Sequence, residues 1–148
     1  MAQFGRPEAD TYNSDGWTED DGNTVDMWEE INEVTASDTD YIRSALAPTS
    51  DVYVTRLSDM EDPVSSTNHV VRWRWGKSAA GGATINGTVQ LRQGYVNEGT
   101  QGTLIATCAS AEVVPDAFTD DSYTLSGGEA DAITDYTALY IRILANQV

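Results

Sequence analysis

The stretch HVVRWRWG at residues 69–76 limits the folds open to this chain more than any other, because bulky apolar and cationic side chains alternate along it. Successive side chains on a β-strand point to opposite faces of the sheet. A strand at this position has one face that packs in a core and one face that is offered to solvent or to a partner. The packing face carries Val71, Trp73 and Trp75, and the other face carries Val70, Arg72 and Arg74.

Further runs along the chain are rich in β-branched and aromatic residues or alternate between apolar and polar residues, and both patterns favour strands. A short loop with two glycines, at 77–82, separates the first strand from the run at 84–92. This spacing predicts that the two strands form a hairpin. The runs are 51–57, 84–92, 103–110, 118–125 and 137–144.

Two short segments have helical features. In residues 25–31, Trp28 and Ile31 are three positions apart, which fits one or two helical turns, and a short strand is the alternative. Ser126 is followed three residues later by Glu129, which is the form of a capping box at the start of a helix. Helix is therefore expected to be a minor part of the fold.

The number and spacing of these elements predict an all-β fold. Seven or eight short strands separated by glycine-rich turns are typical of a β-sandwich or a jelly roll. The 148 residues have the size of one domain, which we assign to residues 24–148. Residues 1–23 have little apolar periodicity, so we expect an extended N-terminal arm. Trp17 would anchor this arm, either on its own domain or on a neighbouring subunit.

The acidic charge excludes several classes of function. The formal net charge is −16, from 24 acidic and 8 basic residues. Nucleic-acid binding needs a basic surface for the phosphates, and anionic membranes repel such a chain, so neither partner is expected. Residues 1–62 hold 16 acidic residues against three arginines. The first half is therefore expected to be a solvated or partner-facing layer, and residues 63–148 the main source of the core.

The N-terminal residues MAQFGRP lack the apolar core of a signal peptide, and no run approaches the roughly 18 apolar residues of a membrane span. A protein of this kind would leave a cell by assembly or lysis.

Residues with catalytic or metal-binding chemistry are sparse. His69, the one histidine, stands at the start of a strand, where a structural hydrogen bond is expected, and Cys108, the one cysteine, lies in an apolar run, where a buried side chain is expected. Nothing marks a carboxylate pair for glycoside hydrolysis. We therefore expect no enzymatic activity and no cofactor. Clustered acids at 15–16, 20–23 and 59–62 are interpreted as solvated turns, with a loop-bound calcium ion as the alternative.

Four arginines lie at outward positions of predicted strands and suggest a contact surface. The guanidinium group is planar and well suited to carboxylate partners. One interpretation is an exposed face with local ion pairs; the other is a subunit interface in which the acidic half of one copy meets the arginines of the next. Exposed ion pairs contribute only about 0–1 kcal/mol each, so that interface would need tryptophan anchors as well. The candidate interface residues are Trp17, Arg72, Arg74, Arg92 and Arg142.

Seven short motifs stand out along the chain: GWT at 16–18, WEEINE at 28–33, DTDYI at 38–42, LSD at 57–59 with Pro63, HVVRWR at 69–74, VQLRQG at 89–94 and AITDYTAL at 132–139. In this order they resemble a family of small tailed-bacteriophage virion proteins. The resemblance spans about Gly16 to the C terminus and carries no catalytic residues. It implies a jelly-roll structural module of the particle, on the capsid or the tail.

The resemblance and the residues together lead to one main hypothesis, a capsid decoration or cement protein. Such a protein would bind the major capsid protein on the outer surface of the head, stabilise the shell and form a homo-oligomer. It would be made in the host cytoplasm and located on the virion. A tail-associated structural protein is a variant of this hypothesis. The alternative is an adhesion module that binds surface glycans, with Trp17, Trp28 or Trp75 as stacking platforms.

Overall fold

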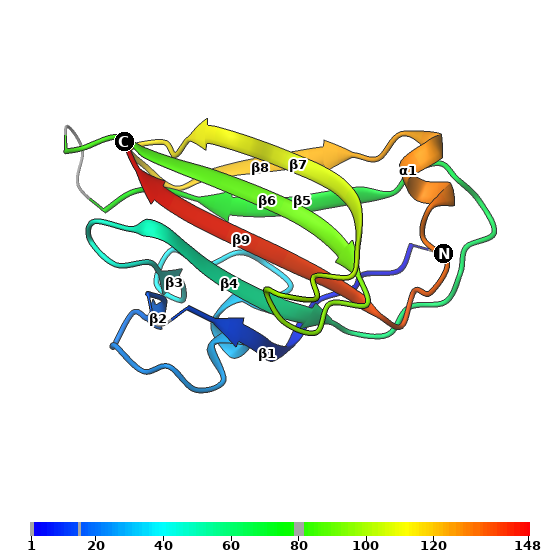
Figure 1. Cartoon of the computed structure of the whole chain (residues 1–148), viewed down its shortest axis with the longest axis horizontal. Helices are drawn as coiled ribbons and strands as arrows, with labels where there is room; N and C mark the ends of the chain where they lie inside the picture. The colour runs from blue at the N-terminus through cyan, green and yellow to red at the C-terminus, as the bar shows by residue number, and fades with distance from the viewer. Residues whose placement is uncertain (1, 15, 79–81) are drawn as a thin grey trace.

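The computed structural model describes residues 2–14, 16–78 and 82–148, and within these ranges the chain is mostly β (Figure 1). The pairings between neighbouring strands are antiparallel. The described residues form nine strands: β1 (Pro7–Asn13), β2 (Thr18–Glu19), β3 (Ile42–Arg43), β4 (Thr49–Leu57), β5 (Val70–Trp75), β6 (Ile85–Gln93), β7 (Thr103–Val113), β8 (Thr119–Thr124) and β9 (Leu139–Gln147).

Two sheets form the body of the molecule. The larger sheet has the strand order β1-β4-β9-β6-β7, and the smaller sheet pairs β5 with β8. In Figure 1 the smaller sheet lies behind β6 and β7. The short strands β2 and β3 pair separately, beside the β1–β4 side of the larger sheet. An antiparallel sandwich of this kind agrees with the all-β expectation.

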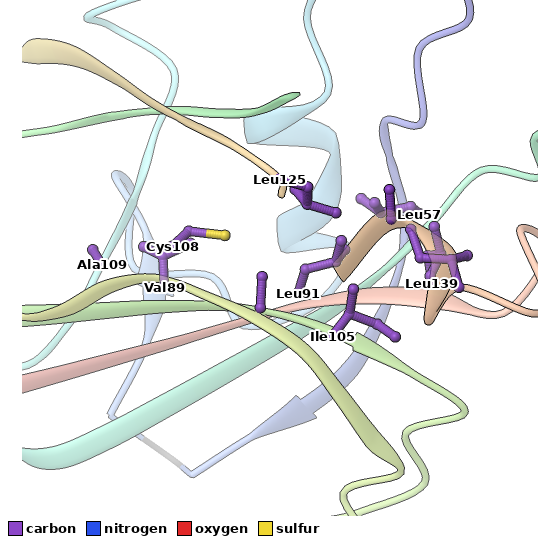
Figure 2. Packing of buried hydrophobic residues seen from close by; sticks show 11 residues of the cluster. Leu57, Val89, Leu91, Ile105, Cys108, Ala109, Leu125 and Leu139 are labelled. Atoms are coloured by element: carbon purple, nitrogen blue, oxygen red, sulfur yellow. The ribbon is translucent and has the colours of Figure 1, made fainter. Parts of the chain in front are cut away.

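The main core lies between the two sheets (Figure 2). Side chains of the larger sheet, such as Val89 and Leu91 on β6, are almost fully buried there. Trp73 and Trp75 of β5 pack against this cluster, with their rings edge to face at a centroid distance of 5.6 Å. The face of the 69–76 strand that the sequence assigns to the core is therefore confirmed.

A second core cluster lies on the same face of the larger sheet as the main core. There the chain from Trp17 to Ile42 covers Tyr53 of β4 and Ala145 of β9. Trp17 and Met27 pack with Tyr53, which has no exposed surface. The Asp10 carboxylate ties the layers together, because it accepts hydrogen bonds from the backbone N–H groups of Met27 and Trp28 and from the Tyr53 hydroxyl. The predicted helical turns appear as a short 3₁₀ helix, Met27–Ile31.

The predicted strands and the capping box are confirmed, with small shifts of the boundaries. The runs at 51–57, 84–92, 103–110, 118–125 and 137–144 correspond to β4, β6, β7, β8 and β9. At the second helix, α1 (Gly127–Asp131), the Ser126 hydroxyl accepts from the Glu129 N–H while the Glu129 carboxylate accepts from the Ser126 N–H.

The predicted hairpin between strands 69–76 and 84–92 is wrong. β5 pairs with β8, and β6 pairs with β7 and β9, so the two strands belong to different sheets. The reason is packing: a Cβ atom on Gly87 would lie 2.6 Å from the Trp75 ring, which shows that this ring sits directly on β6 across the core. Alternation identifies the faces of a strand, but it does not identify its partner.

The N-terminal segment is also more ordered than the expected arm. Residues 7–13 form β1, which pairs with β4 along the edge of the larger sheet. Two irregularities interrupt this pairing, between Pro7 and Ala9 and between Asp10 and Tyr12. Such bulges blur the period-two alternation that would mark a strand in the sequence. Trp17 packs in its own domain, which is one of the two positions expected for it.

Candidate functional site

The outward face of β5 carries the first two of the four candidate arginines. Arg74 makes a bidentate contact with Asp38, with Nε–Oδ1 and Nη2–Oδ2 distances of 2.6 and 3.0 Å. It also contacts Asp120 at 3.0 Å on the paired strand β8, and its guanidinium lies 5.8 Å from the ring centroid of Phe118. Arg72, by contrast, is exposed and makes no hydrogen bond or ion pair within the described ranges.

Contacts with Asp38, Asp120 and Phe118 hold the Arg74 side chain in place, but these residues remain at the surface. The Asp38 side chain keeps 54% of its surface exposed, and that of Arg74 keeps 26%. Hydrogen bonds from Arg74 lower the pKa of the Asp38 carboxyl. The outward face of β5 therefore has one arginine that is already occupied by carboxylates and one, Arg72, that has no partner among the described residues.

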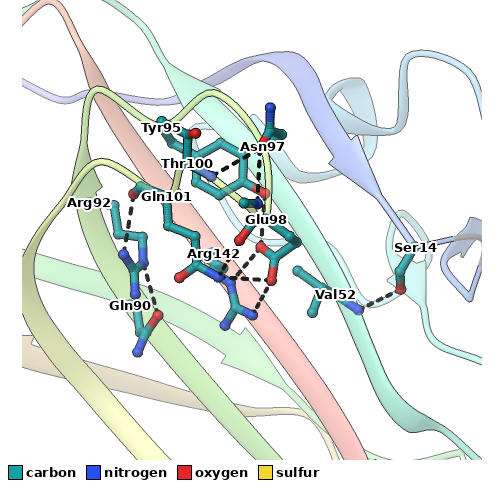
Figure 3. A network of polar contacts seen from close by, with 11 residues as sticks. Ser14, Val52, Gln90, Arg92, Tyr95, Asn97, Glu98, Thr100, Gln101 and Arg142 are labelled. Carbon is teal, nitrogen blue, oxygen red and sulfur yellow. Dashed lines mark hydrogen bonds and ion pairs between the residues drawn. The ribbon is translucent and has the colours of Figure 1, made fainter.

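The other two arginines lie on the outward face of the larger sheet and are buried there (Figure 3). Arg142 on β9 makes a bidentate contact with Glu98, with Nε–Oε1 and Nη2–Oε2 distances of 2.9 and 2.7 Å. Arg92 on β6 donates to the Gln90 side chain and to the Gln101 carbonyl oxygen. The expected single face of four arginines is therefore corrected: Arg72 and Arg74 lie on one sheet, and Arg92 and Arg142 lie on the other.

The segment 94–102, which we call the strap, covers these two arginines. It leaves β6 at Gly94 and returns to β7 at Gly102, and both glycines have positive φ, 69° and 64°. Tyr95 of the strap is 3% exposed and packs against Val52 and Val54 of β4. The strap thus covers an apolar cluster, and its own Glu98 pairs with Arg142 on the sheet beneath.

The electrostatics of the strap follow from this burial. Hydrogen bonds from Arg142 hold the pKa of the Glu98 carboxyl below its ordinary value. Burial, and then the neighbouring charge of Arg142, lowers the pKa of Arg92. Reasoning from the sequence missed Glu98 and Tyr95; the available signal is the pair of glycines that bounds a polar loop between two strands.

None of the three candidate stacking tryptophans is fully exposed. Trp17 is 7% exposed and packs against Tyr53 at a centroid distance of 6.3 Å. Trp28 and Trp75 are half-buried, and the Trp75 ring is turned toward Gly87 in the core. Trp17 therefore belongs to the core in this structure.

The histidine and the cysteine have structural environments. His69 Nε2 lies 2.7 Å from the Tyr136 hydroxyl, and the two rings pack at a centroid distance of 5.8 Å. Cys108 is buried in the main core, and burial raises the pKa of its thiol to about 11. A thiol held neutral in this way is a poor nucleophile at neutral pH.

The acidic turns are organised by their own backbones. The Asp21 carboxylate accepts from the Asn23 N–H, and that of Asp62 accepts from the Val64 N–H. Within the described ranges no group of three or more His, Cys, Asp or Glu residues is arranged to hold a metal ion. Asp15, in the first of the three acidic clusters, lies outside the described residues.

Carboxylates crowd in the second core region. Burial raises the pKa values of Glu19, Glu30 and Glu33, and neighbouring acids add to the effect. Burial and repulsion between neighbouring acids therefore oppose the ionisation of these carboxyl groups.

Two open hollows lie on the surface of the part of the chain that the structure describes. One of about 230 Å³ is lined by the loop at 62–66 and by residues of and after α1, among them Asp131 and Tyr136. Another, of about 90 Å³, lies between Leu46, Ile85 and Gln147. Contacts with a large partner surface suit this shape better than enclosure of a small molecule.

Comparisons of the chain with protein-family models, with curated proteins and with solved structures find no match. Among the described residues there is no helix with the length and hydrophobicity needed to cross a membrane.

Proposed function

We propose that this chain is a non-enzymatic structural protein of a tailed-phage virion, and specifically a decoration or cement protein that binds the major capsid protein on the outer surface of the head. The proposal includes a finer assignment of the fold as a shortened jelly roll. A jelly roll is a long hairpin rolled into two sheets, in which strands pair in a nested order and most members have eight strands.

Nested strand pairing is the observation that carries the proposal. β6 pairs with β7, β5 pairs with β8 outside them, and β4 pairs with β9 outside those. The closure of β9 onto β6 then gives the order β4-β9-β6-β7 in one sheet and β5-β8 in the other. This is the rolled hairpin with one strand pair fewer than the eight-stranded form.

The motifs that resemble phage virion proteins lie on this frame. Trp17 is buried, Trp73 packs in the main core and Tyr136 contacts His69. A resemblance carried by framework residues supports a shared scaffold rather than a shared catalytic site. A scaffold that acts by binding suits a decoration protein, whose function is to add contacts to a shell.

Binding to empty shells tests the proposal. Shells assembled from the major capsid protein of the phage that encodes this chain, and lacking the chain itself, are mixed with the purified protein and sedimented at several salt concentrations. We expect the protein to sediment with the shells and to raise the temperature at which they disrupt. The absence of binding at every salt concentration would overturn the proposal, and binding to purified tails instead would move the protein to the tail.

The outward face of β5 provides a matched test of where the shell binds. The double variant Arg72→Ala, Arg74→Ala removes both cations from this face, and Arg43→Ala removes an exposed arginine of β3 as the control. We expect weaker shell binding for the double variant only. Unchanged binding would show that the face is merely solvated and that the shell contacts another surface.

Glycan binding has no specific observation in its favour. Stacking on a sugar requires an exposed aromatic face, whereas Trp17 is buried and Trp28 and Trp75 are half-buried. A glycan-array signal that disappears with Trp28→Ala would restore that alternative.

A further inference from the structure

One end of the sandwich carries almost no charge. The first residues of β4 and β6 and the last residues of β7 and β9 meet there, on the left of Figure 1. Direct pairing joins Thr49 to Asn146, Asn146 to Asn86, and Asn86 to Val113. We call this surface the uncharged end and define it by the segments 44–50, 82–87, 110–115 and 144–148.

Its composition differs sharply from that of the chain. Charged residues make up 22% of the whole sequence, but Glu112 is the single charged side chain in these four segments. Of the nearby charges, Lys77 and Asp116 neutralise each other at 3.0 Å, whereas Asp51 keeps its negative charge and its two carboxylate oxygens accept from backbone N–H groups of the 45–49 turn. The uncharged end therefore carries far fewer charged side chains than the rest of the chain, with Glu112 and the adjacent Asp51 as its acidic residues.

Large aliphatic side chains gather on this surface. Leu46 is 93% exposed, Val113 66% and Val148 67%. The backbone brings them together, because Gln147 donates to the Pro48 carbonyl oxygen and Val148 to that of Thr84. Single exposed aliphatic residues are common on protein surfaces, but several on one uncharged surface indicate a contact region.

The opposite end of the sandwich is acidic. The loop after β4 exposes Asp59, Glu61 and Asp62, and the segment from α1 to β9 exposes Asp131 and Asp135. These segments lie on the right of Figure 1, with α1. The two ends thus differ in charge although they close the same strands.

We propose that the uncharged end is a self-association surface, where two copies of this chain meet end to end about a two-fold axis. Each copy carries a net charge of −16, so contacts that bring acidic surfaces within the Debye length of about 8 Å are repulsive. The uncharged end is the place where two copies approach with few carboxylates between them. A two-fold axis lets the same patch serve both copies.

The expected affinity is modest. Four strands spaced about 4.8 Å apart give a width of about 15 Å, so even with its loops the end is smaller than the roughly 800 Å² per partner of a standard interface. Association at micromolar to millimolar concentrations is the corresponding expectation. The proposal stands independently of shell binding, because it concerns a different surface and requires no second protein.

Sedimentation equilibrium of the full chain between about 10 μM and 1 mM, at low and high salt, tests the proposal. We expect a monomer–dimer equilibrium whose dissociation constant falls with added salt, because salt screens the repulsion between copies while the aliphatic contact is insensitive to it. Leu46→Asp and Val113→Asp should each raise the dissociation constant at least tenfold. Val64→Asp is the control, since Val64 is 91% exposed in the loop between β4 and β5, away from the uncharged end.

Three results would overturn the proposal: a monomer at every concentration and salt level, a dimer that dissociates as salt is added, or equal weakening by Val64→Asp. The second result would instead support contact between acidic and arginine surfaces. Unchanged melting temperatures of the three variants show that the fold is intact, as expected for substitutions at exposed positions.

Discussion

The arginines of two ion pairs, Arg142–Glu98 and Arg74–Asp38, lie at equivalent outward positions on their strands, but the first pair is much more buried than the second. Arg142 and Arg74 each hold a carboxylate in a bidentate contact. The Arg142 side chain is 10% exposed and that of its partner Glu98 is 28% exposed, whereas the corresponding values are 26% for Arg74 and 54% for Asp38. The difference comes from the strap, which covers the larger sheet, while only the 38–41 segment flanks β5.

Two ion pairs with the same bidentate geometry need not contribute equally to the stability of the fold. A buried charge that loses its partner pays for its desolvation, whereas an exposed charge is rehydrated by water. The larger sheet should therefore depend on its pair much more than the smaller sheet does. Four predictions test this difference, in order of decreasing effect.

The largest effect is expected at the glycines that bound the strap. A Cβ atom on Gly102 would lie 2.2 Å from the Gln93 carbonyl oxygen, at a φ of 64°. Gly102→Ala should lower the free energy of unfolding by about 2–3 kcal/mol, from the left-handed conformation and the clash together. Gly94→Ala is the control, because its φ is 69° but no atom lies within 4 Å of the added Cβ. It should cost about 1 kcal/mol.

Urea denaturation of both variants measures this difference. Equal losses would show that the strap moves aside without cost and that its close return to β6 is unimportant.

The second prediction concerns a variant that removes the negative charge of Glu98 in the strap. Glu98→Gln keeps the size of the side chain but leaves Arg142 without an anion in a buried position. We expect a loss of about 2 kcal/mol, below the 3–5 kcal/mol of a fully buried pair because Glu98 is partly exposed. Glu61→Gln, at an exposed position, is the control and should change stability by no more than about 0.5 kcal/mol. A loss below 0.5 kcal/mol for Glu98→Gln would contradict the dependence of the larger sheet on this pair.

The strand positions and the core face of β5 could be predicted because they depend on local alternation, but the burial of Arg92 and Arg142 could not. Arg92 and Arg142 alternate with inward residues in the same way as Arg72 and Arg74, so the pattern gives them the same orientation. Their burial depends on a loop that folds back over the sheet, which is a tertiary event. The partner of β5 was likewise unpredictable, because it depends on how Trp75 packs on Gly87.

The Trp17 assignment illustrates a different limit. A tryptophan in a polar segment predicts docking, but it does not tell which surface receives the ring. The docking depends on Asn13, whose side chain donates to the Trp17 carbonyl oxygen and accepts from the Trp17 N–H, and on Tyr53 far along the chain. Hydrogen bonds of this kind have no periodic signature in the sequence.

The third prediction concerns the stabilisation by Glu98, which is lost when its carboxylate is protonated at low pH. The pKa of Glu98 is lowered in the folded state, so its stabilisation is complete above the unfolded value near 4.3 and is lost as the pH falls through the lower folded value. The stability difference between the wild type and Glu98→Gln should therefore be constant from pH 7 to about 5 and shrink below about 4.5. Urea midpoints at each pH measure it. A difference that stays constant down to pH 2.5 would show that the ionised carboxylate is not the source of the stabilisation.

The smallest effect is expected at the exposed pair. Asp38→Asn retains one acceptor for Arg74, and the guanidinium keeps its contacts with Asp120 and Phe118. Water can also hydrate Arg74 at this surface, so the loss should be below about 1 kcal/mol and should decrease further in 1 M salt. If Asp38→Asn were as costly as Glu98→Gln, the covering of an ion pair by the strap could not be what separates the two sheets. The bidentate geometry that the two ion pairs share would then explain both losses of stability.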